Sequence, residues 1–216
     1  GSGFKAEAGR YHLYVSWACP WAHRALIFRA IKGLEEMISI STVNPVMVSE
    51  GWTFEPGDNV IPDSVNGAQR LYEVYLKADP NYEGRVTVPT LWDRETGTIV
   101  NNESSEIIRM FNSAFNHLTG NTLDFYPVQL RAEIDEVNTL VYSKVNNGVY
   151  KTGFATTQKA YEDNCLSLFQ TLDELDQRLL RQRYLVGGQL TEADWRLFTT
   201  LVRFDPVYHL HFKCNK

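Results

Sequence analysis

With 216 residues, of which 44% are hydrophobic and 22% charged, the chain has the length and composition of an ordinary globular protein with one large or two modest domains. Its net charge of −5 argues against nucleic-acid binding as its main purpose, because neutralising phosphates requires clustered Lys and Arg. Only three cysteines occur and no apolar run approaches the roughly 20 residues of a membrane helix, so we expect a cytoplasmic protein without structural disulfides or a membrane partner.

The N-terminal elements predict a β-α-β unit. Residues 11–16 (YHLYVS) alternate and are rich in β-forming residues, which indicates a strand. After a short loop, Pro20 suits the first turn of a helix, and residues 21–32 carry apolar side chains at helical spacing. Residues 38–43 (ISISTV) have the pattern of a second strand, so we expect a right-handed crossover between the two strands.

A long stretch rich in turn residues follows, from residue 44 to residue 82. Within it, only residues 68–78 have the pattern of a helix. An irregular stretch of this length inside a compact domain is usually functional, which makes it a candidate for covering a ligand.

Two short strands and a helix complete the mixed half of the chain, at residues 87–92, 98–100 and 103–115. Asn102 or Ser104 is placed to cap the helix. Pro89 lies in strand-like sequence, and a proline there belongs at an edge or at the start of a strand. From sequence alone the Val88–Pro89 bond is expected to be trans, since only about 5–6% of X–Pro bonds in folded proteins are cis.

The C-terminal half shows helical periodicity only. Residues 117–127 have the mixed polar and turn character of a linker. The pattern beyond it predicts helices at residues 128–146, 156–182 and 191–203. Thr191 and Asp194 have the spacing of a capping box at the start of the last one. A mixed α/β half is therefore followed by an all-helical half.

Cys19 lies in the loop directly before the first predicted helix. Unpaired N–H groups and the helix dipole favour negative charge at this position, which lowers the pKa of a thiol and favours its reactive thiolate. The alternative is a small buried packing residue, the usual role of an arbitrary cysteine. Redox motifs of this geometry often carry a second cysteine three residues on, where this chain has Ala22, so a disulfide cycle requires a small external thiol.

The other two cysteines receive no chemical role from the sequence. Cys165 and Cys214 are interpreted as packing residues. His209 and His211 together with Cys214 imitate a zinc site, but no fourth ligand is evident nearby. We therefore expect no metal.

Six stretches span nearly the whole chain in the order of one known family. They are CPWAHR (residues 19–24), GWTF (51–54), VTVPTLWD (86–93), NNESSEIIRMFN (101–112), NNGVYKTGFA (146–155) and LTEADWRLFTTLVRFDPVYHLHFKCN (190–215). Together they resemble the glutathione transferase superfamily, most closely its Xi class, the glutathionyl-hydroquinone reductases. Their joint specificity is high, because each occurs in its expected place.

The resemblance implies an α/β plus all-α fold. Residues 1–116 would form a thioredoxin-like glutathione-binding domain, residues 117–126 a linker, and residues 127–216 a helical glutathione-transferase C-terminal domain. In the family the chain continues beyond the stretch that ends at Asn215, with another pocket tyrosine. If this sequence is a fragment of a longer protein, its acceptor site and any dimer contacts are incomplete. The resemblance also suggests a homodimer.

The resemblance implies glutathione as a cosubstrate and assigns residues to it. The Val88–Pro89 bond is implied to be cis, which leaves the Val88 backbone free to pair with the cysteinyl part of glutathione like an added β-strand. Glu103 and Ser104 are similar to the pair that holds the γ-glutamyl end, and a helix N-terminus with a hydroxyl suits a carboxylate. Trp52 and Arg85 match further glutathione contacts, and Arg85 offers a forked cation.

Tyr150 and Tyr208 match the tyrosines that face the hydroquinone in the Xi class. A phenol beside an aromatic diol stacks on it, donates a hydrogen bond and stabilises developing phenolate charge. Each assignment has a structural alternative. Tyrosines at helical spacing are often half-buried packing residues, Ser104 is otherwise a helix cap, Trp52 a loop anchor and Arg85 a solvated surface residue.

The resemblance therefore implies glutathione-dependent reduction of glutathionyl-hydroquinones to hydroquinones in a ping-pong cycle. Cys19 attacks the glutathionyl sulfur, Tyr150 or Tyr208 assists the leaving hydroquinone, and a second glutathione resolves the mixed disulfide and releases oxidised glutathione. One alternative is an omega-like thiol transferase or dehydroascorbate reductase that uses the same Cys19 on other acceptors. Another is a non-catalytic interaction module of the same fold.

Overall fold

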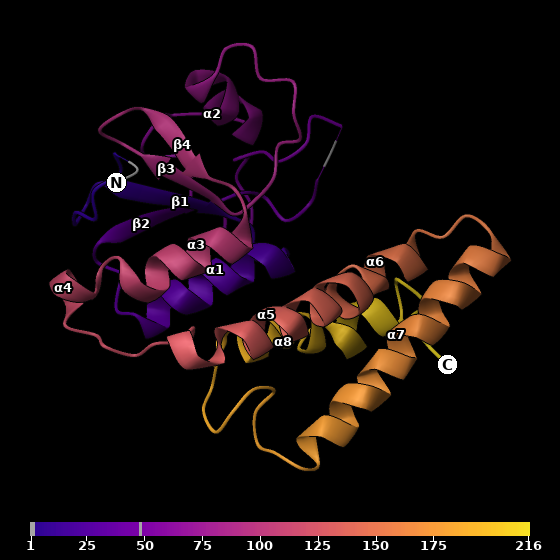
Figure 1. The fold of residues 1–216 in the computed structure, drawn as a ribbon. Helices are drawn as coiled ribbons and strands as arrows, with labels where there is room; N and C mark the ends of the chain where they lie inside the picture. Colours follow the sequence, from indigo (N-terminus) through magenta and orange to yellow (C-terminus); the bar gives the residue numbers. More distant parts are fainter. Residues whose placement is uncertain (1–2, 48) are drawn as a thin grey trace. The chain divides into compact units, whose positions relative to one another are not determined.

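The computed structural model describes residues 3–47 and 49–216 of the chain. The chain forms two compact units, Gly1–Leu123 and Asp124–Lys216. The first unit contains a β-sheet with helices, and in the described residues of the second the regular elements are all helical (Figure 1). This succession confirms the predicted α/β plus all-α class.

A mixed sheet with the strand order β2-β1-β3-β4 forms the centre of the first unit. β1 and β2 are parallel, as predicted for a β-α-β unit, and β3 runs antiparallel to both β1 and β4. The strands are β1 (Tyr11–Val15), β2 (Ile38–Thr42), β3 (Thr90–Asp93) and β4 (Thr98–Asn101). Because β1 is central, its side chains are buried on both faces of the sheet.

Helices pack on both faces of this sheet. The helices α1 (Pro20–Ile31) and α3 (Ser104–Ser113) lie side by side against one face, and α2 (Leu71–Ala78) lies on the other (Figure 1). Alternate side chains of β1 follow this division. Tyr11 packs edge-on against Phe115, between α3 and α4, with 6.0 Å between ring centroids. Tyr14 on the opposite face packs against Phe54, also at 6.0 Å.

The predicted elements of this unit agree with the structure except at three starts. The helix predicted from residue 68 begins at Leu71, because the residues before it pair as extended chain with Thr53 and Phe54. The strand predicted from residue 87 begins at Thr90, directly after Pro89, which has no N–H for a strand ladder.

The third difference concerns the cap of α3. Its N-cap residue is Glu103, which makes no side-chain capping bond, so neither Asn102 nor Ser104 caps the helix as predicted. Both side chains have tertiary partners: the Asn102 amide donates to the Tyr75 hydroxyl at 3.3 Å, and the Ser104 hydroxyl accepts from Arg24 at 3.4 Å. Tertiary hydrogen bonds have replaced the local ones.

The second unit is built from consecutive helical segments. Residues 128–146 are helical as predicted, but in three hydrogen-bonding patterns: the 3₁₀ turn η1 (Val128–Leu130), the α-helix α5 (Arg131–Leu140) and the π-helix η2 (Val141–Asn146). The remaining segments are α6 (Gly148–Gly153), α7 (Gln158–Leu179), α8 (Glu192–Leu201) and the π-helix η3 (Phe204–His209). A short helix, α4 (Asn116–Thr119), lies at the start of the predicted linker in the first unit.

The periodicity did not predict α6 or η3. Gly148 and Gly153 are the first and last residues of α6, and Pro206 lies inside η3. Because glycine and proline usually end helices, the sequence pattern did not indicate a helix at either place. The capping box predicted for α8 is confirmed, since the Asp194 carboxylate accepts the Thr191 backbone N–H at 2.9 Å. The core of the unit is Ile134, Val137, Val141, Val145, Val149, Leu168, Leu175, Leu185, Val186, Ala193, Leu197, Tyr208 and Cys214.

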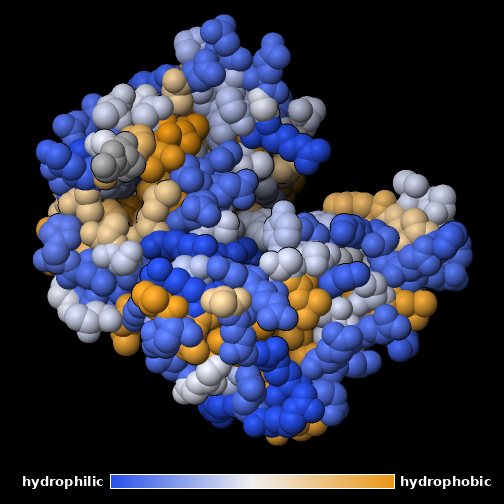
Figure 2. Space-filling view, in the orientation of Figure 1, coloured by the Kyte–Doolittle hydropathy of each residue, from blue (hydrophilic) through white to orange (hydrophobic). Residues whose placement is uncertain are grey.

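Hydrophilic residues predominate on the face of the molecule that Figure 2 shows, and hydrophobic residues occur there in smaller groups. Within residues 3–47 and 49–216, no helix combines the length and the apolar character needed to cross a membrane.

Candidate active site

Cys19 occupies the N-cap position of α1, with Pro20 as the first helical residue. Its Sγ accepts a hydrogen bond from the Ala22 backbone N–H at 3.5 Å, and its own N–H donates to the Ser16 carbonyl at 3.2 Å. The side chain is partly exposed. The Ala22 N–H and the positive end of the helix thus face the sulfur of a partly exposed residue, the environment in which a thiolate is stabilised.

The loop before β3 lies against this sulfur. The Cys19 thiol donates to the Val88 carbonyl, with 3.6 Å between Sγ and oxygen. The Val88–Pro89 peptide bond is cis, as the family resemblance implied and contrary to the expectation from sequence alone. The fold therefore brings together Cys19 and Val88, two of the candidate residues, from the ends of different strands.

Ser104 connects the start of α3 to α1. Its side chain is buried, and its Oγ accepts a hydrogen bond from the Arg24 guanidinium at 3.4 Å. That guanidinium also lies 4.6 Å from the centre of the Trp21 ring. Glu103, the other member of the candidate pair, is exposed at the N-cap of α3, where backbone N–H groups of the helix start are available to an anion.

The remaining candidates of the first unit, Trp52 and Arg85, lie in loops. The Trp52 carbonyl accepts the Leu71 N–H at 2.9 Å, and its side chain is half-buried. The Arg85 side chain is exposed, and its carbonyl accepts the Tyr82 hydroxyl at 2.8 Å. Across the described residues, no hydrogen bond or ion pair joins either of the two to Cys19.

The two candidate tyrosines of the second unit are in contact. Tyr150 on α6 and Tyr208 in η3 meet edge to face, with 6.0 Å between ring centroids. Phe212 packs edge-on against both, at 5.5 and 5.2 Å, and Phe154, 71% exposed, stacks on Tyr150. Tyr208 is only 2% exposed, whereas Tyr150 is half-buried. This is an aromatic cluster with one open side.

Cys165 and Cys214 differ from Cys19 in being buried. Burial, reinforced by the neighbouring Cys165, raises the pKa of the Cys214 thiol to about 12, although the Thr152 hydroxyl acts in the opposite direction. Such a thiol stays protonated and unreactive at neutral pH. In the described part of the chain, no group of three or more His, Cys, Asp or Glu side chains is arranged to hold a metal ion.

Sequence reasoning did not single out three buried polar residues of the first unit. They are His12 and Tyr14 on β1 and Asp63 in the irregular stretch. The Tyr14 hydroxyl donates to Asp63, and the His12 ring is hydrogen-bonded to the hydroxyls of Ser39 and Ser41. The available signal was weak: Pro62-Asp63-Ser64 is a turn-forming tripeptide, and His12 interrupts an otherwise apolar strand. Phe154 and Phe212 were likewise missed, although both lie within stretches that carry the family resemblance.

The chain matches known families over most of its length. Residues 18–114 match the family described as glutathione S-transferase, N-terminal domain, and residues 158–214 match the glutathione S-transferase, C-terminal domain. The glutathionyl-hydroquinone reductase PcpF of Sphingobium chlorophenolicum is 61% identical over 214 residues, which cover 99% of this chain and 68% of that protein. The glutathionyl-hydroquinone reductase YqjG of Escherichia coli is 58% identical over 217 residues, covering 99% of this chain and 66% of that protein.

Solved structures agree with these matches. The glutathione-bound structure of YqjG superimposes with a TM-score of 0.97 at 58% identity, over 99% of this chain and 70% of that one. The crystal structure of the glutathione S-transferase Xi from Phanerochaete chrysosporium superimposes with a TM-score of 0.96 at 61% identity, over 99% of this chain and 74% of that one. The chain thus spans about two thirds of the length of the two curated relatives.

Proposed function

The chain belongs to the Xi class of the glutathione transferases, and from this membership we propose that it reduces glutathionyl-hydroquinones to hydroquinones at the expense of glutathione. The observation that carries the proposal is the position of Cys19. Its sulfur lies at the N-terminus of α1, 3.6 Å from the Val88 carbonyl, and the residue is partly exposed. The relatives PcpF and YqjG are named for this activity, and YqjG has been solved with glutathione bound.

In the first half of the reaction, the Cys19 thiolate attacks the sulfur that joins glutathione to the hydroquinone ring. A sulfur–sulfur bond forms, the ring carbon–sulfur bond breaks, and its electron pair stays on the ring carbon, which takes up a proton. Tyr150 or Tyr208 supplies that proton or holds the ring hydroxyls. The hydroquinone leaves, and Cys19 remains as a mixed disulfide with glutathione.

In the second half, the thiolate of another glutathione attacks the glutathione sulfur of the mixed disulfide. Oxidised glutathione leaves and the Cys19 thiolate is restored. An external thiol is required because Ala22 occupies the place of a resolving cysteine, and Cys165 and Cys214 are buried.

The glutathione site is proposed at the Cys19 end of the sheet. The Val88 backbone, next to Pro89, would pair with the cysteinyl part of glutathione, since Val88 already lies against the sulfur. The start of α3, with Glu103 and Ser104, would hold the γ-glutamyl carboxylate. Trp52 would cover the tripeptide, and the exposed guanidinium of Arg85 would bind a carboxylate.

We further propose that the whole protein acts as a cytoplasmic homodimer. None of the three cysteines forms a disulfide, which suits a reducing compartment where glutathione is abundant. The dimer follows from class membership, and sedimentation of the purified protein tests it.

Mass spectrometry after exposure to a glutathionyl-hydroquinone tests the central step. We expect one glutathionyl adduct on Cys19 and none on Cys165 or Cys214, because only Cys19 is partly exposed and lies at a helix N-terminus. Adducts confined to the two buried cysteines would end the proposal. Treatment of the adduct with glutathione should then release one equivalent of oxidised glutathione.

The two tyrosines distinguish this function from that of a thiol transferase or dehydroascorbate reductase. Replacing Tyr150 and Tyr208 by Phe should slow hydroquinone release by roughly 10-fold or more, since a proton donor is lost, but spare small disulfide substrates. Tyr184→Phe is the matched control, because that tyrosine lies in the same unit outside the aromatic cluster. Equal losses on both substrates would contradict the assignment of the tyrosines.

A further inference from the structure

Two polar side chains of β1 lie on the sheet face that is turned away from α1 and α3. His12 and Tyr14 alternate with apolar residues along the strand and meet edge to face, with 4.7 Å between ring centroids. Both are completely buried. Tyr14 bonds directly to Asp63, and His12 is connected to the Pro62 carbonyl through the Ser41 hydroxyl. Pro62 and Asp63 belong to the irregular stretch that also contains Trp52. Buried polar groups on a central strand are costly unless they are paired, so these pairings have a structural purpose.

The buried Asp63 carboxylate accepts four hydrogen bonds. Its Oδ1 accepts from the Tyr14 hydroxyl at 2.9 Å and from the Val65 and Asn66 N–H groups at 3.0 Å, and its Oδ2 accepts from the Ala68 N–H at 3.1 Å. No Lys or Arg pairs with this carboxylate in the described chain. Neutral donors alone stabilise it, and in doing so they fix the turn from residue 63 to residue 68.

The Tyr14 hydroxyl remains a donor at every physiological pH. Burial, and next the negative charge of Asp63, raise the pKa of Tyr14 far above its ordinary value. The Asn66 amide donates to the same hydroxyl oxygen at 2.9 Å, so the oxygen accepts one bond while its hydrogen is directed at Asp63.

A second chain of hydrogen bonds reaches the same turn through His12. The Ser41 hydroxyl donates to the Pro62 carbonyl at 2.8 Å, and must therefore accept from His12 Nε2 at 2.9 Å. His12 Nδ1 then accepts from the Ser39 hydroxyl at 2.6 Å, and Ser39 in turn accepts from the Arg94 guanidinium at 2.5 Å. Each group donates in one direction, which assigns His12 the neutral tautomer protonated at Nε2.

The turn that these bonds hold is joined directly to Trp52. Beyond Ala68 the chain pairs with the segment of residues 52–54: the Leu71 N–H donates to the Trp52 carbonyl at 2.9 Å, and the Phe54 N–H donates to the Gln69 carbonyl at 2.8 Å. Phe54 also packs on the Tyr14 ring. The place of the Trp52 backbone thus depends on the turn that Asp63 and Tyr14 hold.

We propose that Tyr14 and Asp63 are positioning residues that preset Trp52 for glutathione. They touch Trp52 only through the backbone between residues 63 and 71, and they act by keeping the indole in its binding position before the tripeptide arrives. This inference rests on the proposed function. Presetting a contact lowers the ordering cost of binding, so its loss weakens glutathione binding while the chemistry at Cys19 is unaffected.

Isothermal titration of the full chain with glutathione tests the inference. Tyr14→Phe removes the hydroxyl alone, and Asp63→Asn removes the charge and presents an amide N–H to the Ala68 N–H. Each should raise the Kd for glutathione about fivefold, the worth of one net hydrogen bond, with kcat unchanged at saturating glutathione. The matched control is Asp58→Asn, an exposed aspartate of the same stretch, which should leave Kd unchanged.

A double-mutant cycle with Trp52→Ala separates positioning from general stability. With alanine at position 52 there is no indole to position, so adding Tyr14→Phe should not weaken binding further. Additive losses would overturn the inference, as would an unchanged Kd in the single variants. A wild-type protein that binds no glutathione at all would overturn the proposed function, and the inference with it.

Discussion

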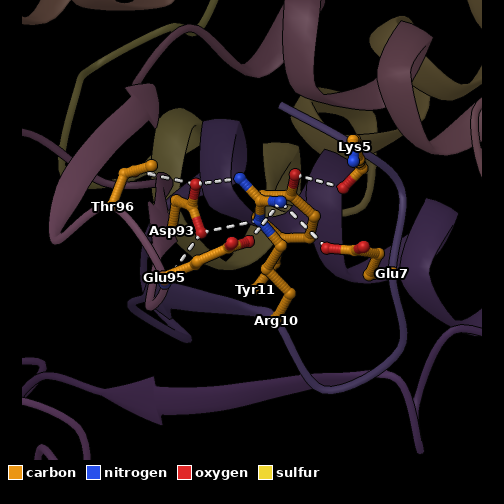
Figure 3. A network of polar contacts seen from close by, with 7 residues as sticks. All are labelled: Lys5, Glu7, Arg10, Tyr11, Asp93, Glu95 and Thr96. Carbon is orange, nitrogen blue, oxygen red and sulfur yellow. Dashed lines mark hydrogen bonds and ion pairs between the residues drawn. The ribbon is translucent and has the colours of Figure 1, made fainter. Parts of the chain in front are cut away.

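The two ends of the β1–β3 strand pair carry different functional groups, an ion pair at one end and a cysteine thiol at the other. At the end where β1 begins and β3 finishes, Arg10 and Asp93 form a buried ion pair (Figure 3). At the other end, β1 leads into the Cys19 turn and β3 follows Val88, whose carbonyl lies against the thiol. The same two strands therefore carry a neutralised charge cluster at one end and a reactive sulfur at the other.

In the charge cluster, formed by Glu7, Arg10, Asp93 and Glu95, the charged groups are paired with one another. The Arg10 guanidinium holds Asp93 in a bidentate grip, with nitrogen–oxygen distances of 2.9 and 2.6 Å, and also reaches Glu7 at 2.9 Å and Glu95 at 2.5 Å. The Thr96 hydroxyl donates to Asp93 as well. Burial by itself raises the pKa of Asp93, but the hydrogen bonds from Arg10 and Thr96 outweigh it and hold that pKa below its usual value. The cluster ties the N-terminal segment to the β3–β4 hairpin.

The sulfur end is open by comparison. The Cys19 sulfur accepts from the Ala22 N–H at 3.5 Å and lies 3.6 Å from the Val88 carbonyl, neither of which is a charged partner, and the residue is partly exposed. Paired charges stabilise the folded chain, whereas a catalytic nucleophile has to stay accessible to its substrate. The comparison predicts that changes at one end affect catalysis and changes at the other affect stability.

The largest effect is expected at the sulfur. Cys19→Ser should lower turnover of a glutathionyl-hydroquinone by roughly 1,000-fold or more, because a serine hydroxyl cannot form the mixed disulfide. Steady-state kinetics measures the loss, and the midpoint of urea unfolding should change little. Cys165→Ala is the control for removing a thiol, with turnover retained. A Cys19→Ser protein as active as wild type would favour a non-catalytic role for this site.

At the charge end, Asp93→Asn should reduce the free energy of unfolding by about 3 kcal/mol, since it leaves the buried Arg10 guanidinium without its anion. Urea unfolding measures the change. Glutathione affinity of the folded variant should equal that of wild type. If affinity fell in proportion to stability, the two ends would not be independent.

A pH effect is expected from His12, the second residue of β1. Burial, and next the charge of Arg94, lower the pKa of His12 to about 4 from an ordinary 6.5. The unfolded chain thus binds a proton between these values that the folded chain does not. The contribution of His12 to the free energy of unfolding should fall as the pH drops from 6.5 toward 4, by up to about 3 kcal/mol, and His12 adds no further loss below that.

The His12 contribution is isolated with a variant that cannot titrate. In His12→Gln, this part of the pH dependence of the free energy of unfolding should disappear, whatever the variant's stability at pH 7. An unchanged slope between pH 6.5 and 4 would show that His12 is not the responsible group.

The smallest effect is expected at the rim of the charge cluster. Glu95 contacts Arg10, but its side chain is 65% exposed, so solvent screens the pair. Glu95→Gln should therefore cost less than about 1 kcal/mol in urea unfolding. A loss as large as that of Asp93→Asn would mean that the cluster acts as one unit.

Much of the fold followed from local sequence patterns. The pattern of residues 11–16, Pro20 with the helix after it, and residues 38–43 each agree with an observed element to within one residue. The capping box of α8 was equally readable, since its two residues are three positions apart. The predicted capping residue of α3 was wrong, because the side chains of Asn102 and Ser104 bond to residues distant in the sequence, which no local pattern reveals.

The candidate site was recognised partly by local chemistry and partly by resemblance. The position of Cys19 before a helix followed from the residues themselves, and the structure places it at the N-cap. The cis form of the Val88–Pro89 bond came only from the family. The roles of Trp52, Arg85, Glu103 and the two tyrosines stay predictions, and the variants of Trp52, Tyr150 and Tyr208 described above test the roles of those three residues.

By itself, the sequence determined the order of the strands, the order of the helical segments other than α4, α6 and η3, and the place of a cysteine at a helix start. Periodicity and capping make this possible because they act over about four neighbouring residues. The tertiary structure alone decided that Cys19 meets Val88, 69 positions away, and that Tyr14 meets Asp63, 49 positions away. Such contacts depend on how strands pair and loops close, and no short-range pattern encodes them.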